Sequence, residues 1–148
     1  MQYIPSAALC LAAFGLSACG NAEDPAPAAD QLSIANPEVV EALPGRDVTK
    51  AHMVITGGAE DTVLVGARSP RLSAVEIHET TRSGNGVAGM RRIAELPIPA
   101  GESVVLQQGG LHIMLFGVDE GELDGGLPLV LDFRPGGERE VLLQTVPR

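Results

Sequence analysis

The sequence predicts an all-β protein, an antiparallel β-sandwich of Greek-key type, on three observations. Short runs rich in Val, Leu and Ile recur along the chain, the turn formers are frequent, with 18 Gly and 11 Pro, and no apolar stretch keeps a 3.6-residue period for three turns. Spacing of this kind is typical of sandwiches. Nine candidate strands cover residues 38–42, 50–56, 62–68, 73–80, 90–95, 102–107, 111–118, 127–133 and 139–146.

The composition bounds the size and the partners of the protein. A chain of 148 residues fits one domain plus an export segment, and with 3% aromatic residues and no Trp the core must rest on aliphatic side chains. The net charge of −9 repels phosphate backbones, so we expect no nucleic-acid partner. The same charge either attracts cations or a basic protein, or simply keeps the domain soluble.

The N-terminus has the pattern of an exported lipoprotein. Residues 7–18 are apolar but shorter than the roughly 20 residues of a membrane-spanning helix, and they end in Leu16-Ser17-Ala18-Cys19, which resembles the bacterial lipobox. We therefore predict a signal peptide over 1–18, a lipidated Cys19, a flexible Ala/Pro/acid-rich tether over 19–32 and a folded domain over 33–148.

Two details qualify the export prediction. No Lys or Arg precedes the apolar run, unlike the usual signal peptide, so a buried N-terminal helix is the alternative. By resemblance to Gram-negative sorting, Gly20 after Cys19 points to the outer membrane on the periplasmic side. Once the signal peptide is removed, the domain has no Cys, which excludes disulfides, thiolate nucleophiles and Cys-ligated zinc or copper.

Two His and two Met form the candidate metal site. Eleven residues separate His78 from Met90 and twenty-one separate Met90 from His112, which is followed at i+2 by Met114. Side chains at i and i+2 of a strand share one face, so His112 and Met114 can reach one ion. Thioethers favour Cu(I), and imidazole suits copper in either oxidation state, so these residues predict one bound Cu(I) ion.

Each residue also has a structural alternative. Met90 alone fits a core filler, His112 a hydrogen-bonded half-buried residue and His78 a solvent-facing one. A metal-site role is the less favoured alternative for His52-Met53, because adjacent side chains point to opposite faces. We expect Met53 in the core and His52 on the surface.

Charged residues flank the candidate site. Glu76 or Glu79 could orient the imidazole of His78. Arg91 and Arg92 either meet an acidic partner or solvate a strand edge, and we favour the second.

The spacing of these four residues resembles the signature of the periplasmic copper chaperone family called PCu(A)C. That signature is His, an optional Met, ten residues, Met, twenty-one residues and His-x-Met, and Glu79 occupies the optional Met position here. The segments 98–101 and 109–117 also look like the family, and the resemblance extends over residues 33–146. It implies the cupredoxin-like fold, Cu(I) ligation by His78, Met90, His112 and Met114, and delivery to an acceptor protein, either cytochrome oxidase subunit II or another copper carrier.

The sequence therefore predicts a membrane-anchored copper chaperone. The alternatives are a copper-sequestering lipoprotein without a dedicated client and a metal-free interaction module. We do not expect an enzyme, because the chain shows no Ser/His/acid triad pattern.

Overall fold

The computed structural model describes residues 31–119, 121 and 123–148, and this part of the chain consists of strands and connecting turns. The predicted signal peptide, Cys19 and the tether up to residue 30 lie outside the described residues. Among the described residues, no helix could cross a membrane. The strands are β1 (Ser33–Val40), β2 (Val48–Thr56), β3 (Thr62–Arg68), β4 (Ala74–Arg82), β5 (Ala88–Ile93), β6 (Leu96–Ile98), β7 (Ser103–Leu106), β8 (Leu111–Phe116), β9 (Leu127–Arg134) and β10 (Gly137–Val146).

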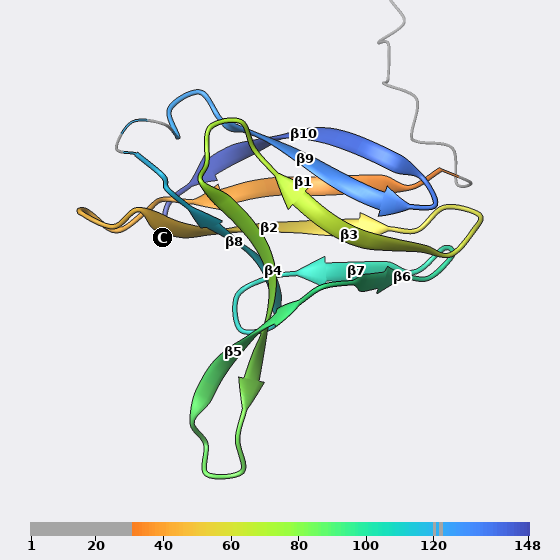
Figure 1. The fold of residues 1–148 in the computed structure, drawn as a ribbon, viewed down its shortest axis with the longest axis horizontal. Coiled ribbons are helices and arrows are strands. Elements are labelled where there is room, and N and C mark those ends of the chain that lie inside the picture. The colour runs from red at the N-terminus through yellow and green to blue at the C-terminus, as the bar shows by residue number, and fades with distance from the viewer. Residues whose placement is uncertain (1–30, 120, 122) are drawn as a thin grey trace, which may run out of the picture.

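The strands form a β-sandwich, as the sequence predicts (Figure 1). One layer runs in the order β5-β4-β8-β7-β2-β1, and the other runs β10-β9-β3-β6. Neighbouring strands are antiparallel with two exceptions: β1 and β10 run parallel and join the two layers, and β7 and β8 run parallel where they meet. Strand β8 also pairs with both β4 and β2, so it lies between them where the metal site is predicted.

The core is aliphatic and follows the two-residue period of the strands. In β2 and in β9, every second residue is buried, whereas the residues between them are only partly buried. Met53, only 2% exposed, lies in this core, as predicted. The other buried hydrophobic residues are Val39, Ala51, Ile55, Leu64, Ile77, Leu96, Ile98, Leu106, Ile113, Leu115, Val118, Leu127, Leu129, Leu131, Phe133 and Leu143.

Two strand predictions were wrong in instructive ways. The first strand begins at Ser33 rather than at 38, because a register shift between Ala35 and Glu38 takes up Asn36-Pro37, and Asn36 has a positive φ of 49°. Strand β6 was missed, because its three residues include Pro97, which breaks the usual strand pattern. It pairs with the first three residues of β3, at the edge of the sheet.

The β4–β5 hairpin extends beyond the sandwich (Figure 1). Its residues 81–92 are all exposed, although the start of β4 pairs with β8 in the body of the sheet. The hairpin thus begins in the body of the sheet and ends in a tip that is open to solvent. Met90 lies on the exposed part of the hairpin.

Candidate metal centre

The register of three strands brings the four predicted ligands to one face of the sheet. Strand β4 pairs with β8 so that His78 lies directly opposite His112, with 6.1 Å between ring centroids. In the same pairing Met114 lies opposite Glu76, two residues from His78. Directly paired residues share a face, and so do residues at i and i+2. His78, His112 and Met114 therefore lie on one face.

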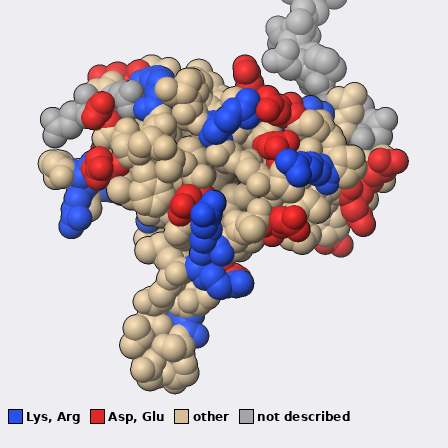
Figure 2. All heavy atoms as spheres, in the orientation of Figure 1, with Lys and Arg blue, Asp and Glu red and all other residues tan. Residues whose placement is uncertain are grey.

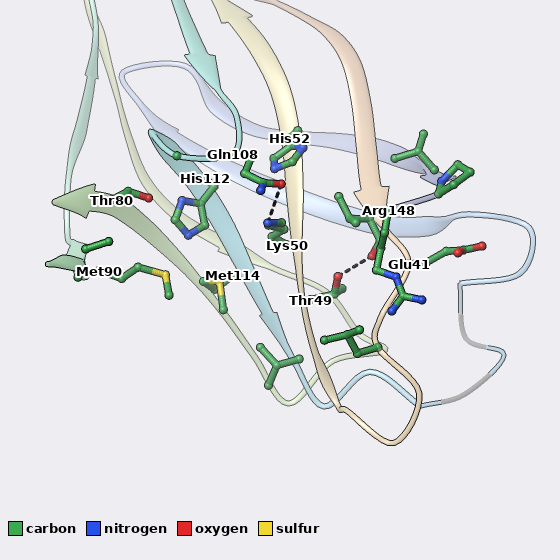
Figure 3. A pocket seen from close by; sticks show the side chains of 18 residues that line it. Glu41, Thr49, Lys50, His52, Thr80, Met90, Gln108, His112, Met114 and Arg148 are labelled. Carbon is green, nitrogen blue, oxygen red and sulfur yellow. Dashed lines mark hydrogen bonds between the residues drawn. The ribbon is translucent and has the colours of Figure 1, made fainter. Parts of the chain in front are cut away.

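The hairpin supplies the fourth residue. Met90 of β5 pairs with Thr80 of β4, and Thr80 lies two residues from His78 on the same face. In Figure 3 the side chains of Met90 and Met114 lie next to each other beside the His112 ring. The four residues, which the sequence separates by up to 36 positions, are therefore neighbours in the fold.

An open groove begins at these residues. Met90, His112 and Met114 line it together with apolar residues of β1, β2 and the C-terminal end, and its volume is about 810 Å³ (Figure 3). That is far more space than one metal ion fills. Of the four predicted ligands, only His78 does not line the groove.

In the neutral form of each imidazole, the hydrogen bonds assign the proton to one ring nitrogen and leave a lone pair on the other. The Nδ1 atom of His112 lies 3.0 Å from the carbonyl oxygen of Gly110, which only accepts, so Nδ1 donates and Nε2 keeps its lone pair. The Nε2 atom of His78 lies 2.8 Å from a carboxylate oxygen of Glu76 and donates to it. Its Nδ1 atom is buried and has no hydrogen-bond partner. A buried nitrogen with a free lone pair is what a metal ligand requires.

Glu76 is the carboxylate that orients His78. The hydrogen bond from His78 lowers the pKa of the Glu76 carboxyl, and the nearby Arg92 guanidinium lowers it further, against an opposing effect of burial. Glu76 therefore stays ionised and holds the His78 ring in one tautomer. Glu79, the other candidate for orienting His78, forms an ion pair with Arg91 at 2.6 Å.

The two arginines lie on β5, the edge strand of its sheet layer. Arg92 lies 3.6 Å from Glu76, and the Arg91 and Arg92 side chains are 67% and 69% exposed. Figure 2 shows basic side chains where the hairpin leaves the sandwich, next to acidic ones, and both kinds of charge are also spread over the sandwich itself. Basic groups therefore lie close to the candidate site in an acidic protein.

Exposure changes steeply across the site. His112 is 4% exposed, whereas Met90 is 63% exposed, the highest value among the exposed large hydrophobic residues. A methionine that fills a core is buried among other apolar side chains, and Met90 is not. Its exposure therefore argues against the alternative that Met90 is a core residue. The site thus has one deeply buried ligand candidate and one that a partner can reach.

His52 is the residue whose place the sequence predicted least well, since a metal-site role for it was considered but not favoured. The prediction of a surface His52 is wrong, because the side chain is half-buried, lines the groove and has a buried Nε2 atom without a partner. Burial lowers the pKa of His52, and Lys50 and His112 lower it further, against a smaller effect of Glu38. Its approach to His112 depends on the β2–β8 register, which no sequence signal reveals.

Within the described residues, no three His, Cys, Asp or Glu side chains lie close enough together to hold one metal ion. Nitrogen and oxygen ligands alone therefore do not make a site here. With the two thioethers, the donor set is soft, and soft donors select Cu(I) over zinc, calcium or magnesium.

The fold and the site define the class: a cupredoxin-like β-sandwich with His and Met side chains gathered at one end of a groove. Residues 32–145 match the family model described as "Putative lipoprotein LpqE-like". The chain belongs to this LpqE-like family. It is also 28% identical over 125 residues to "Putative lipoprotein Lxx21020" of Leifsonia xyli subsp. xyli, a match that covers 81% of this chain and 74% of that protein.

Solved structures show the same fold. The copper-bound PCuAC domain from PmoF2 superposes with a TM-score of 0.67 at 19% identity, covering 82% of this chain and 97% of that domain. Apo-DR1885 from Deinococcus radiodurans has a TM-score of 0.59 at 28% identity, over 100% of this chain and 97% of that one. The Cu(I) form of DR1885 also has a TM-score of 0.59, at 29% identity, covering 76% of this chain and 75% of that one. The cupredoxin-like architecture predicted from the sequence is thereby confirmed.

Proposed function

We propose that this protein is a lipid-anchored extracytoplasmic copper chaperone that binds one Cu(I) ion through His78, Met90, His112 and Met114 and passes it to an acceptor protein. The observation that carries the proposal is the unpartnered Nδ1 atom of His78, buried beside His112 on the face that also bears both thioethers. Solved relatives whose titles name bound copper, the PmoF2 domain and the Cu(I) form of DR1885, support it.

The donor set suits carriage of Cu(I) better than catalysis. Thioethers are neutral and release no proton on binding, and both imidazoles bind in their neutral form. The ligands differ in accessibility, since Met90 is exposed and His112 is buried. An incoming acceptor ligand could therefore displace Met90 first and leave the buried ligands until last.

The difference in exposure between Met90 and His112 favours delivery of the ion over its storage. A sequestering site gains from enclosing its ion, whereas a site with an exposed ligand beside an open groove admits a partner. We propose a copper-containing oxidase, at its subunit II, or a second copper carrier as the recipient.

The predicted lipid at Cys19 would keep the carrier at a membrane surface, where its local concentration near membrane-bound acceptors is high. The family and the relative are both described as lipoproteins, which supports an anchor but not an outer-membrane location.

The test is an anaerobic Cu(I) titration of the chain from residue 19 onward, with Cys19→Ser to prevent lipidation; this protein retains every described strand. We expect saturation at one Cu(I) per chain, followed by transfer to an apo-acceptor. The absence of saturable binding would refute the copper proposal, and tight binding without any transfer would favour sequestration.

A further inference from the structure

His52 lies in the same row of the sheet as the two predicted histidine ligands. Strand β2 pairs with β8 through Lys50 opposite Met114 and Ala51 opposite Ile113. This ladder ends at Ala51 and Ile113, and His52 and His112 lie one position beyond that last pair. His52 is paired with Glu38 of β1, and His112 is paired with His78 of β4 on its other side. Neighbouring strands are about 4.8 Å apart, so His112 has one imidazole on each flank.

The two flanking histidines occupy different surroundings. His52 lines the groove together with Met90, His112 and Met114, whereas His78 does not line it. Figure 3 shows His52 on the opposite side of His112 from Met90. Both flanking residues have one buried ring nitrogen without a hydrogen-bond partner, Nδ1 in His78 and Nε2 in His52. Buried polar atoms nearly always have a hydrogen-bond partner. Two buried ring nitrogens without one, on the two strands that flank His112, suggest a common role.

The three imidazoles do not form one site together. No three His, Cys, Asp or Glu side chains converge at metal-binding distance in the described part of the chain. His52 therefore does not act as a fifth simultaneous ligand in this arrangement. Its side chain does line the groove together with three of the four proposed ligands.

We propose that His52 is an exchange ligand through which Cu(I) moves between the four-residue site and the groove. This inference rests on the function proposed above. A bond from copper to the His52 imidazole forms as the bond to the His78 imidazole breaks, while His112, Met90 and Met114 hold the ion. Copper stays Cu(I), both imidazoles are neutral, and no electron or proton is transferred. The ion then faces the groove, which has room for a segment of the acceptor.

The experiment measures the rate and the equilibrium of Cu(I) transfer separately. The Cys19→Ser chain is loaded with one Cu(I), mixed anaerobically with excess bathocuproine disulfonate and followed by stopped-flow absorbance. Competition titration with the same chelator gives the affinity. The variants are His52→Gln, which removes the ligand, and His52→Met, which replaces it with another Cu(I) ligand. Gln108→Ala is the control, because it removes a neighbouring groove side chain that is not a Cu(I) ligand.

We expect His52→Gln to slow transfer at least fivefold while the Cu(I) affinity stays within threefold of the wild type. His52→Met should restore the rate to within twofold, and Gln108→Ala should leave it unchanged. An unchanged rate in His52→Gln overturns the inference, and so does an affinity loss of tenfold or more, which would make His52 a resident ligand. Failure of His52→Met to restore the rate also overturns it.

A measurement on the unsubstituted histidines guards against misfolded variants. In the chain loaded with half an equivalent of Cu(I), exchange should broaden the His52 imidazole resonances in proton NMR; unaffected resonances overturn the inference. If the wild type binds no Cu(I), the proposed function fails as well. If it binds normally and only the His52 results disagree, the proposed function stands.

Discussion

At the scale of single residues, ring nitrogens and their partners define the candidate site. His78 donates to Glu76 and His112 donates to the Gly110 carbonyl, so each ring keeps a lone pair on its other nitrogen. Neither arrangement follows from the residue types, because a histidine can donate from either nitrogen. The chemistry of the site therefore depends on the partner of each ring.

Replacement of a thioether separates ligation from packing. Met114→Leu keeps the volume and the apolar character of the side chain but removes the sulfur, so Cu(I) affinity should fall by about tenfold or more, or ~1.4 kcal/mol. Chelator competition measures the affinity, and circular dichroism checks the fold. Met53→Leu is the matched control, because Met53 lies in the core, and it should leave the affinity unchanged. Equal affinities for wild type and Met114→Leu would remove Met114 from the ligand set.

The Glu76–His78 pair predicts a pH dependence of stability in the copper-free protein. The pKa of Glu76 is lowered in the folded state, so the unfolded chain binds more protons than the folded one in acid. The pair thus stabilises the fold above the unfolded pKa of about 4.5, and this contribution disappears as the pH falls through the lowered folded value. Urea unfolding between pH 7 and pH 3 should show Glu76→Gln less stable than wild type at pH 7 and the two converging in acid. A constant difference at all pH values would contradict this assignment.

At the scale of elements, the β4–β8 pair positions the metal site. Gly117, just after β8, allows the start of β4 to come close: a Cβ atom on Gly117 would lie 2.5 Å from the Ser73 hydroxyl oxygen and 3.0 Å from its backbone nitrogen. Ser73 donates from that nitrogen to the carbonyl of Phe116 at 3.0 Å. This contact fixes the end of the register that places His78 opposite His112.

Gly117→Ala should therefore destabilise the protein and disturb the site. The positive φ of 75° strains any other residue there, and the close approach adds to the cost, which we expect to reach about 2 kcal/mol. Urea unfolding measures the stability. Gly45→Ala is the control, because its φ of 72° is similar but nothing lies within 4 Å of the added Cβ atom. If both variants lose the same stability, the contact with Ser73 has no structural role.

At the scale of the whole molecule, the sandwich and the hairpin have separate tasks. The two layers bury the aliphatic core, and the hairpin carries Met90 outside it next to the groove. The proposed lipid anchor, Cys19, precedes the first strand in the sequence and is therefore separate from both the sandwich and the hairpin along the chain.

Removal of the lipidation site tests this arrangement in cells. Cys19→Ala should shift the protein from the membrane fraction to the soluble fraction, because a signal region without its lipid acceptor gives no stable anchor. Fractionation followed by immunoblotting measures the distribution, and the purified variant should bind Cu(I) like the wild type. A variant that still sediments with membranes would show that lipidation is not the anchor.

The sequence by itself determined the fold class, because strand periodicity is a local property of the chain. It also singled out the four proposed ligands, because the spacing of the scarce His and Met residues resembles a known copper-binding signature. It also predicted that Met53 lies in the core, since parity along one strand is enough. Only the tertiary structure decided that Glu76 rather than Glu79 orients His78, and that His52 lies in the groove. Both outcomes depend on which strands pair and in what register, and long-range pairing is set by the packing of the whole sandwich.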